Sequence, residues 1–418
     1  MAVGIWLDLS DRRLRRADGR REGPDRQGHE GILIVTALLL LLAGAGCAYA
    51  LLASWLVARG LSPAPRLART AEAAGRPGVS LLKPLHGGEP DLYRNLRSFV
   101  VQDYDGPVEV IFGVSRSDDP AVPLVERLIA EFPDRNLRLV VDDRRHGTNG
   151  KVSNLINMAE RASRPVLVFA DSDMLVESDY LDRVVTALDA PGVGAVTCLY
   201  RGVAISGLWS RLAVQWIDHH FLPNVIVGMA LGLAKPCFGS TIALGRDTLD
   251  AVGGFAAFQD RLADDYAVGE AVRALGLTVS VPRDLVLGHT CTADSFAALM
   301  RQELRWSRTI RSVDPAGFVG SIVTHPIPLA TLAALLSGFA PATLGMLAAS
   351  VTSRLLLQII VGRALNTGTK SLIIGPVRDY AAFLVFLLGF WPGSIDWRGE
   401  RFALRHDGSM TAPDKAGS

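Results

Sequence analysis

Long apolar segments lie toward both ends of the chain. Residues 32–57 contain no charged side chain and are rich in Leu and Ala. About 20 apolar residues cross the roughly 30 Å hydrocarbon core of a bilayer, so this stretch predicts a transmembrane helix. A secretory signal has a shorter apolar region and a small-residue cleavage site. The polar residues 1–31 have no apolar period and predict a disordered tail.

The middle of the chain has a different pattern. Between residues 78 and 311, short apolar runs alternate with stretches whose apolar residues have helical spacing. Strands that alternate with helices predict an α/β domain with a mostly parallel sheet covered on both faces. Ligands bind such sheets outside the carboxyl ends of the strands. The predicted strands are 79–82, 108–114, 137–141, 166–170, 193–198 and 278–281, and the predicted helices are 92–101, 121–131, 152–161, 177–188 and 266–275.

Hydrophobicity returns over residues 318–391 and predicts two or three further transmembrane or interfacial helices. Arg354, Arg378 and Asp379 fall inside these segments, where an unpaired ionisable group costs a few kcal/mol or more. We expect Arg378 and Asp379 to offset each other's field, although adjacent residues do not share a helix face. The tail over 392–418 is polar. The three apolar pieces are 318–338, 341–364 and 371–391.

Charge and cysteine content exclude several classes of protein. The chain has 43 Lys plus Arg against 42 Asp plus Glu, a net charge of +1, so a nucleic-acid partner is not expected. The cysteines form no C-x-x-C pair, which argues against a zinc knuckle or a disulfide framework and predicts reduced, mostly buried thiols. The adjacent His219 and His220 have no second ligand cluster and predict an ordinary histidine pair. The four cysteines are Cys47, Cys198, Cys237 and Cys291.

Acidic residues follow one of the predicted strands directly. The apolar run at 166–170 ends in Asp171-Ser172-Asp173, a D-x-D sequence at the carboxyl end of a buried strand. Carboxylate oxygens in this position suit a hard divalent cation, Mg²⁺ or Mn²⁺, that holds a diphosphate. Aspartates also occur at strand-to-helix turns for turn and capping reasons alone. The D-x-D is therefore a candidate metal site, with helix capping as the alternative.

Two more acidic pairs and a lysine occupy similar positions. Asp119 precedes Pro120 at the start of a predicted helix, and Asp265 opens the helix over 266–275. Both pairs are also typical of ordinary helix starts. Lys151 begins another helix after a glycine, where a cation meets a phosphate in some proteins and is solvated in most. About 40 residues after Asp265 comes Gln302-Glu303-Leu304-Arg305-Trp306, which is also typical of an amphipathic helix at a membrane surface.

The order of these sites in one α/β domain favours a shared function, and it resembles that of a known family. The chain is similar over most of its length to membrane-bound glycosyltransferases of the ceramide glucosyltransferase type, which carry D, D-x-D, D and Q-x-x-R-W motifs. In animal ceramide enzymes the second motif reads D-S-G, whereas Asp173 completes a D-x-D here. The matching stretches are Val79 to Leu85, Asp118 to Ala121, Asp171 to Asp173, Ala263 to Tyr266, and Gln302 to Trp306.

Other stretches resemble bacterial hopanoid-biosynthesis glycosyltransferases, so two acceptors stay open. These stretches are Lys151 to Met158, Thr197 to Gly202 and Leu262 to Tyr266. The resemblance implies either glucose transfer to ceramide or N-acetylglucosamine transfer to a hopanoid polyol. Both acceptors are membrane lipids that bear a hydroxyl group.

The resemblance also implies a fold and a mechanism. The domain over 78–311 would be a nucleotide-sugar-binding domain of the glycosyltransferase A type. A lipid hydroxyl would attack a UDP-α-sugar with inversion, and the product would be a β-glycolipid. Asp265 would act as the general base, while Asp173, assisted by Asp171, would hold Mg²⁺ or Mn²⁺.

Further residues receive roles in binding the substrates. By the same resemblance Asp119 contacts the uridine of the donor. Lys151 and Arg305 are candidates to meet the negative charge of the diphosphate. Trp306 and Gln302 belong to the acceptor site. With Asp171, these residues complete the predicted set for a UDP-sugar and a lipid.

The resemblance predicts an integral protein of a bacterial inner membrane. Nucleotide sugars are made in the cytosol, so we expect the catalytic domain to face the cytoplasm, although the arginines before the first span favour a cytoplasmic amino terminus. A processive polysaccharide synthase carries the same signatures but needs more spans for a polymer channel. A non-catalytic membrane protein that binds nucleotides is the alternative outside enzymes.

Overall fold

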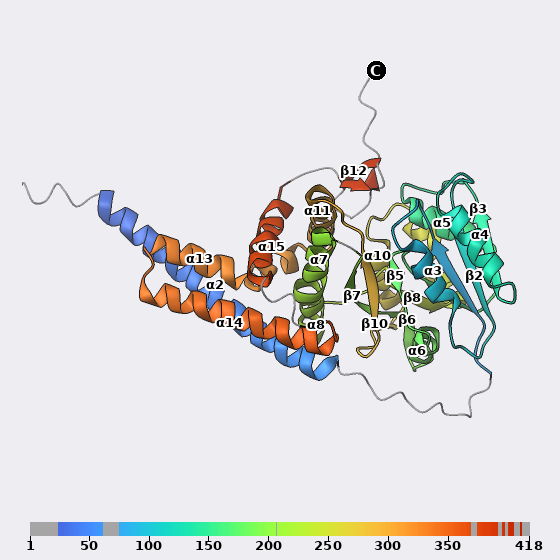
Figure 1. The fold of residues 1–418 in the computed structure, drawn as a ribbon, viewed down its shortest axis with the longest axis horizontal. Coiled ribbons are helices and arrows are strands. Elements are labelled where there is room, and N and C mark those ends of the chain that lie inside the picture. The colour runs from blue at the N-terminus through green and yellow to red at the C-terminus, as the bar shows by residue number, and fades with distance from the viewer. Residues whose placement is uncertain are drawn as a thin grey trace, which may run out of the picture.

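The computed structural model describes residues 24–61, 75–205, 207–368, 374–391, 395–397, 400–404 and 410–411. An α/β domain forms one end of the molecule, and an arm of helices projects from it (Figure 1). The predicted disordered tail over 1–31 lies outside the described residues up to residue 23, and residues 24–31 form the start of helix α2 (Pro24–Gly60) instead. The predicted polar tail over 392–418 lies outside them except for three short strands, β11 (Ile395–Trp397), β12 (Glu400–Leu404) and β13 (Met410–Thr411).

A seven-stranded mixed sheet forms the centre of the domain, in the order β3-β2-β1-β4-β8-β6-β9. Strand β8 runs antiparallel to both of its neighbours, and the other strands run parallel to one another. The mostly parallel α/β fold expected from the alternating pattern is thereby confirmed. The strands are β1 (Val79–Pro84), β2 (Val108–Val114), β3 (Asn136–Val141), β4 (Val166–Phe169), β6 (Val193–Thr197), β8 (Ile242–Gly245) and β9 (Thr278–Ser280).

Helices cover both faces of this sheet because its buried strands carry apolar side chains on both faces. Leu81 of β1 belongs to the apolar cluster on one face, and the next residue, Leu82, belongs to the cluster on the other. Each fully buried aliphatic side chain contributes about 1.5–3 kcal/mol. Helices α3 (Leu92–Val100), α4 (Val122–Glu131) and α6 (Tyr180–Leu188) pack on the first face, and α5 (Gly150–Ala159), α9 (Arg246–Ala251) and α10 (Asp264–Ala274) pack on the second.

A second, three-stranded sheet lies between the central sheet and the helical arm (Figure 1). Strand β10 (Val286–Cys291) pairs parallel with β7 (Leu199–Ala204) and antiparallel with β5 (Met174–Leu175). The sequence pattern did not predict these strands. Helix α7 (Gly207–Trp216), a π-helical turn (Ile217–Phe221) and α8 (Leu222–Ala230) follow β7 along the chain. Helix α11 (Phe296–Val313) follows β10 and packs against α7.

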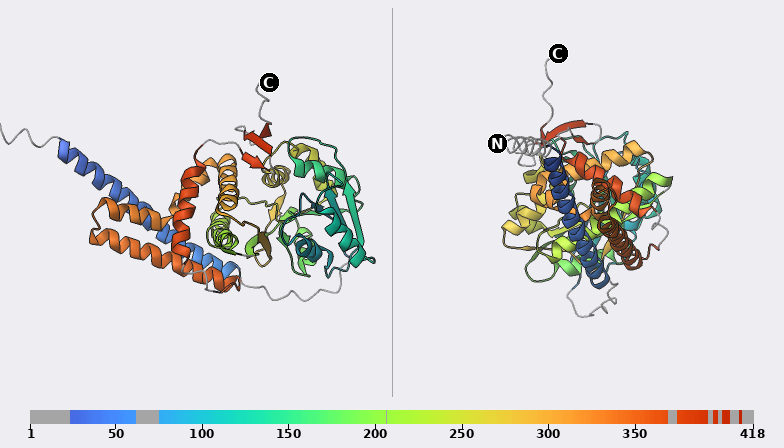
Figure 2. Two further views of the ribbon diagram at one scale, coloured as in Figure 1. Left: turned by 45° about the horizontal axis from the view of Figure 1, so that its top comes forward. Right: turned by 90° about the vertical axis from the view of Figure 1, so that its left-hand side faces the viewer.

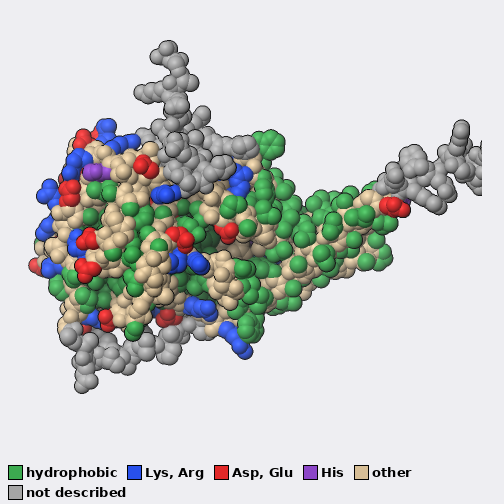
Figure 3. Space-filling model, turned by 180° about the vertical axis from the view of Figure 1, so that it is seen from behind, with side chains coloured by type: hydrophobic (Ala, Val, Ile, Leu, Met, Phe, Trp, Pro, Cys, Tyr) green, Lys and Arg blue, Asp and Glu red, His purple; other side chains and the backbone are tan. Residues whose placement is uncertain are grey.

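The arm consists of α2 (Pro24–Gly60), α13 (Pro326–Leu336) and α14 (Pro341–Ala364), packed side by side. Among the described residues, α2 from His29 and the whole of α14 are long and apolar enough to cross a membrane. Segment Pro315–Thr324 and α13, bent by 65°, add one span at most. Hydrophobic side chains cover the arm (Figure 3). These helices confirm the prediction that the protein associates with membranes.

The arm packs on the domain directly, through α2 against α8, and also through helix α15 (Gly375–Gly389), which lies between α11 and the arm (Figure 2). With 15 residues, α15 is shorter than the roughly 20 residues that a membrane span needs. Pro326 and Pro341 begin helices α13 and α14 rather than interrupt them, because a proline at the first helical position leaves no hydrogen bond unmade.

The buried charges near the arm have partners, but not the ones expected. Arg354 donates to both carboxylate oxygens of Asp379 at 2.8 and 2.7 Å, and the same carboxylate lies 2.8 Å from Nε2 of His220. Arg378 pairs with Glu303 instead. Adjacent helical residues point about 100° apart, so Arg378 and Asp379 leave α15 in different directions and do not neutralise each other.

Candidate active site

The D-x-D turn follows β4 at the carboxyl edge of the sheet. All four residues of β4 are buried, and the chain then leaves the sheet at Asp171, whose N–H donates to the carbonyl of Gly239 at 2.9 Å. Lys83 of the neighbouring β1 donates from Nζ to the carbonyl of Asp171 at 2.5 Å and lies 3.7 Å from the ring centre of Phe99. Burial lowers the pKa of Lys83 to about 7, against the pull of Asp171 and Asp173. A buried lysine therefore stabilises this turn through its hydrogen bond to the backbone of Asp171.

Lys151 is buried among carboxylates rather than solvated. Its Nζ lies 2.7 Å from Oδ1 of Asp171 and 3.3 Å from Oδ2 of Asp264. Burial opposes the charged form, but Asp171, Asp264 and Asp265 together raise the pKa of Lys151 above its ordinary value. The side chain of Asn149 caps helix α5 by accepting from the N–H of Lys151 at 2.9 Å. The helix start thus holds a cation at the centre of the acidic group.

Asp265 lies in the first turn of α10, where its two oxygens accept from backbone N–H groups. Gly239 donates to Oδ2 and Tyr266 to Oδ1, each at 2.8 Å. Burial, with the neighbouring carboxylate of Asp264, raises the pKa of Asp265 to about 6, while Lys151 pulls it down. A carboxylate with this pKa is mostly ionised at neutral pH and is a better proton acceptor than an ordinary aspartate.

Gly239 connects the second and third acidic motifs. Its carbonyl accepts from Asp171 and its N–H donates to Asp265, so one residue contacts both motifs. A Cβ at this position would lie 2.5 Å from Oδ2 of Asp171 and 3.1 Å from Nζ of Lys151. A side chain here would therefore displace the carboxylate of Asp171. Nothing in the sequence pattern singled out Gly239, because the contact joins segments far apart in the chain.

His289 is a site residue that the sequence analysis missed. Its Nε2 lies 3.1 Å from Oδ2 of Asp173, and its side chain is buried in β10. Burial opposes the protonated form, but Asp173 raises the pKa of His289 above its ordinary value. Burial likewise opposes ionisation of Asp173, yet His289, Lys83 and Lys151 lower its pKa. The one available signal was a histidine within the apolar run at 286–291.

The second aspartate of the D-x-D has an unused ligand atom. Oδ1 of Asp173 is buried and has no hydrogen-bond partner in the part of the chain that the structure describes. Within the same residues, no three His, Cys, Asp or Glu side chains converge to hold a metal ion by themselves. Mg²⁺ commonly takes one or two carboxylates and completes its shell with phosphates and water. The residues present therefore fit a divalent ion that arrives with a diphosphate.

Aromatic side chains connect this centre to helix α11. The ring of Trp306 meets His289 edge-on with centroids 5.7 Å apart, and it stacks on Trp216 at 5.1 Å. Tyr200 stacks on His289 at 5.5 Å and on Phe221 at 4.7 Å. Trp306 of the Q-x-x-R-W motif thus contacts His289, the residue that pairs with Asp173 of the D-x-D. Tyr200, Trp216, Phe221 and Trp306 form an aromatic wall on β7, α7, the π-helical turn and α11, the elements between the central sheet and the arm (Figure 1).

The remaining predicted residues lie around this centre. Gln302 and Arg305 are half-buried on α11, the helix that carries Trp306. Asp119 follows β2 at the same edge of the sheet as the D-x-D, since β1 lies between β2 and β4. Both oxygens of Asp119 accept from the N–H of Gly87 at 3.0 Å, and Oδ1 accepts from Ala121 at 2.9 Å. Asp119 therefore shapes the turn before α4, but it is not the N-cap that the capping alternative expected: the helix begins at Val122, and Ala121 is its N-cap.

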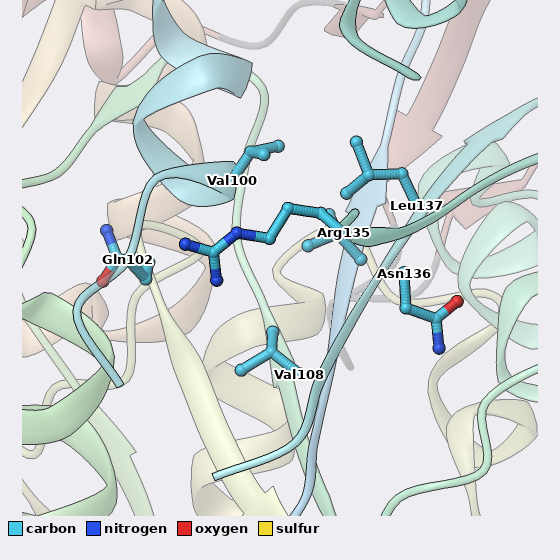
Figure 4. A pocket seen from close by; sticks show the side chains of 7 residues that line it. Val100, Gln102, Val108, Arg135, Asn136 and Leu137 are labelled. Atoms are coloured by element: carbon cyan, nitrogen blue, oxygen red, sulfur yellow. The ribbon is translucent and has the colours of Figure 1, made fainter. Parts of the chain in front are cut away.

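A small pocket near the amino ends of β2 and β3 lies at the opposite edge of the sheet (Figure 4). None of the acidic motifs reaches it. Its lining residues are Val100, Gln102, Val108, Val110, Arg135, Asn136 and Leu137.

A mostly parallel sheet with a D-x-D turn, a further carboxylate at Asp265 and a buried lysine at its carboxyl edge, next to helices able to cross a membrane, is the arrangement expected of a membrane-associated glycosyltransferase. The chain belongs to glycosyl transferase family 21, whose family model matches residues 38–410. The family resemblance seen in the sequence is thereby confirmed at the level of the family. Its hopanoid branch stays a prediction.

Individual relatives are distant. Ceramide glucosyltransferase 1 of Caenorhabditis elegans is 23% identical over 347 residues, which cover 80% of this chain and 73% of the relative. Ceramide glucosyltransferase of Candida albicans is 28% identical over 123 residues, 27% of this chain and 23% of the relative. Among solved structures, a mannosyltransferase from Pyrobaculum calidifontis in complex with GDP-Man and Mn²⁺ covers 85% of this chain and 99% of its own, at 22% identity and a TM-score of 0.49.

Proposed function

We propose that this glycosyltransferase moves a hexose from a UDP-sugar to a hydroxyl group of a membrane lipid. One observation carries the proposal: Gly239 joins Asp171 of the D-x-D to Asp265, and Lys151 lies between the carboxylates. A donor-binding turn and a proton acceptor thus share one edge of the sheet, and the aromatic wall lies between them and the membrane helices. This arrangement suits a water-soluble donor and a lipid acceptor.

The relatives named above support glucose as the sugar and ceramide as the acceptor. The three stretches similar to hopanoid-biosynthesis enzymes support the alternative pair, N-acetylglucosamine and a hopanoid polyol. Both acceptors present a hydroxyl at the membrane surface, and both donors carry UDP. The proposed chemistry is therefore the same for both pairs.

In the proposed reaction, Asp265 takes the proton of the lipid hydroxyl as the oxygen attacks the anomeric carbon. General base catalysis of this kind contributes roughly 10²- to 10⁴-fold. A single displacement at a UDP-α-sugar inverts the configuration and gives a β-glycolipid. Burial and Asp264 keep the pKa of Asp265 near neutrality, which suits a base that must accept and then release a proton.

The diphosphate of the donor would lie over the D-x-D turn. We infer that Asp173 is the principal ligand of Mg²⁺ or Mn²⁺, with Asp171 assisting, because Asp173 has the unpaired oxygen while Lys151 engages Asp171. His289 orients the other oxygen of Asp173. The bound ion supplies Lewis-acid stabilisation of the charge on the departing diphosphate. Lys151, which pairs with Asp171, and Arg305, by the family resemblance, are proposed to meet the same negative charge.

The substrates would bind on either side of this turn. Asp119, at the same sheet edge, is proposed to contact the uridine. Trp306 and Gln302, on helix α11, are proposed to line the acceptor site. The contact between Trp306 and His289 supports this assignment, because it brings the motif next to the residue that orients Asp173.

We also propose that the domain faces the cytoplasm of a bacterial inner membrane. Helices α2 and α14 run in the same direction and end on the domain side, where Val57 and Leu61 belong to one apolar cluster with Val361. Both helices carry a basic residue in the last turn, Arg59 and Arg363. Basic residues gather at the cytoplasmic ends of membrane helices. Labelling of cysteines engineered into the domain from either side of sealed vesicles tests this orientation.

The substrate assignment has a direct test. The full-length protein in proteoliposomes receives UDP-glucose, UDP-galactose or UDP-N-acetylglucosamine, each with ceramide or a hopanoid polyol, and lipids are identified by mass spectrometry. We expect one hexose on one lipid class. A water-soluble polymer would instead identify a processive synthase, and no transfer with any pair would contradict the proposal.

A further inference from the structure

A buried ion pair connects helix α15 to the helix of the Q-x-x-R-W motif. Nη2 of Arg378 on α15 donates to Oε1 of Glu303 on α11, and the two side chains are only 3% and 2% exposed. Nε of the same arginine donates to the carbonyl of Leu212 on α7 at 3.1 Å. Glu303 is the residue next to Gln302 in the motif. Arg378 therefore holds α11 and α7, which both line the aromatic wall.

The contact extends along one face of α11. Ser307 lies one turn after Glu303, and a Cβ on Gly389 of α15 would lie 2.3 Å from its Oγ. Arg311, a further turn along, donates from Nη1 to the carbonyl of Phe390 at 2.6 Å. Residues spaced by four share a helix face. Trp306 occupies a neighbouring face and contacts His289, so a shift of α11 against α15 would displace that ring.

Helix α15 is itself fixed to the arm by the residue after Arg378. Asp379 is fully buried and accepts two hydrogen bonds from Arg354 of α14, a helix able to cross the membrane. Two consecutive residues of α15 thus contact different elements. Arg378 contacts α11 and α7, and Asp379 contacts α14. These two pairs add a side-chain link between α11 and the membrane helices to the chain connection that runs from α11 through Pro315–Thr324 into α13.

Stability alone explains the Arg378–Glu303 pair poorly. Replacing a buried ion pair by well-packed apolar residues is often neutral or stabilising. Oε2 of Glu303 also has no hydrogen-bond partner among the described residues, so its desolvation is only partly compensated. Burial accordingly raises the pKa of Glu303, against the effect of Arg378. What the pair does supply is a directional link between two helices.

We propose that Arg378 is a positioning residue: through Glu303 it sets the place of α11, and with it Trp306, relative to the membrane helices, so that a lipid hydroxyl meets the carboxylates at the correct depth. The inference rests on the proposed function, because it assumes a lipid acceptor at Trp306. It assigns to α15 a role mainly in acceptor alignment, with a smaller effect on the donor side through Arg305 of α11.

The test compares transfer to lipid with hydrolysis of the UDP-sugar by water, both measured on the full-length protein in proteoliposomes. In Arg378→Met we expect kcat/KM for the lipid to fall about tenfold or more, since small misplacements of substrate groups cost up to about 10²-fold. Hydrolysis and the Kd for UDP are expected to change several-fold less than lipid transfer, because the donor turn itself lies on β4 and α5 and only Arg305 lies on α11. Arg378→Lys keeps a cation beside Glu303 and is expected to recover most of the lipid transfer. The exchanged pair Glu303→Arg with Arg378→Glu restores the ion pair but not the hydrogen bond to Leu212, and it is expected to recover part of the transfer.

The matched control is Arg363→Met, which makes the same change at an exposed arginine of α14 and is expected to alter neither reaction. A parallel loss of transfer and hydrolysis in Arg378→Met, without recovery in the lysine variant or the exchanged pair, would overturn the positioning role in favour of a purely structural one. Unchanged lipid transfer in Arg378→Met would overturn it too. A wild-type protein that transfers nothing to any lipid would overturn the proposed function itself.

Discussion

We expect Asp264 to set part of the pH dependence of transfer, because it lies next to Asp265, the proposed general base. Burial and the carboxylate of Asp264 raise the pKa of Asp265 from 3.8 to about 6. A general base acts in its ionised form, so activity is present above this pKa and is lost as the pH falls through it. At pH 5 only about one-tenth of the wild-type sites would carry an ionised Asp265, whereas an ordinary aspartate would be almost fully ionised.

Asp264→Asn removes the like charge while it keeps the shape of the side chain. It also releases Lys151 from a 3.3 Å ion pair, and Lys151 lowers the pKa of Asp265, so both effects act in one direction. If the pKa of Asp265 falls by about one unit, the ionised fraction at pH 5 rises from about one-tenth to about one-half. We therefore expect about a fivefold gain in relative activity at that pH.

The measurement is kcat/KM for the UDP-sugar between about pH 5 and 8, because this ratio reports the ionisations of the free enzyme. Asp118→Asn is the matched control: Asp118 is exposed and pairs with Arg116 on the surface. In Asp118→Asn the fall of kcat/KM at low pH, the acid limb of the profile, is expected to coincide with that of the wild type. An acid limb that stays in place in Asp264→Asn, or moves to higher pH, would refute the assignment of Asp265 as the titrating base.

Three further changes have distinct expected results. Asp173→Asn should raise the Mn²⁺ concentration for half-maximal activity at least about tenfold, and full activity in EDTA would contradict the metal role. Gly239→Ala places a methyl group 2.5 Å from Oδ2 of Asp171 and should lower kcat about 10²-fold with unchanged circular dichroism; wild-type kcat would show that the contact is dispensable. Arg354→Met leaves Asp379 buried without its arginine and should cost about 3–5 kcal/mol of stability; an unchanged thermal midpoint in detergent would contradict it.

Local patterns were sufficient to predict the parts of the site that follow single elements. The apolar run at 166–170 forms the fully buried strand β4 over its first four residues, and a parallel sheet directs the carboxyl end of this strand to the ligand edge. Asp171 and Asp173 therefore lie where the pattern predicts. Trp306 lies on a helix, as its amphipathic spacing indicates, and its contact with His289 brings that helix to the D-x-D.

Contacts between distant segments could not be predicted in the same way. His289 lies on β10, a short strand whose pairing with β7 spans more than 80 residues of sequence. Lys83 lies on β1, and it contacts Asp171 of the D-x-D because β1 pairs with β4 in the sheet. Arg378 and Asp379 were expected to act on each other, but helix geometry gives them separate partners. Each of these results depends on tertiary packing that no local period records.

The most direct test measures transfer and donor binding in one pair of proteins, the wild type and Asp265→Asn. Each is reconstituted with Mn²⁺, labelled UDP-glucose and ceramide, and the parallel arm uses UDP-N-acetylglucosamine with a hopanoid polyol. We expect a β-linked labelled glycolipid from the wild type in one arm, and at least a roughly 10²-fold loss in Asp265→Asn with the Kd for UDP nearly unchanged. Comparable turnover by Asp265→Asn, or no glycolipid from the wild type in either arm, would contradict the account.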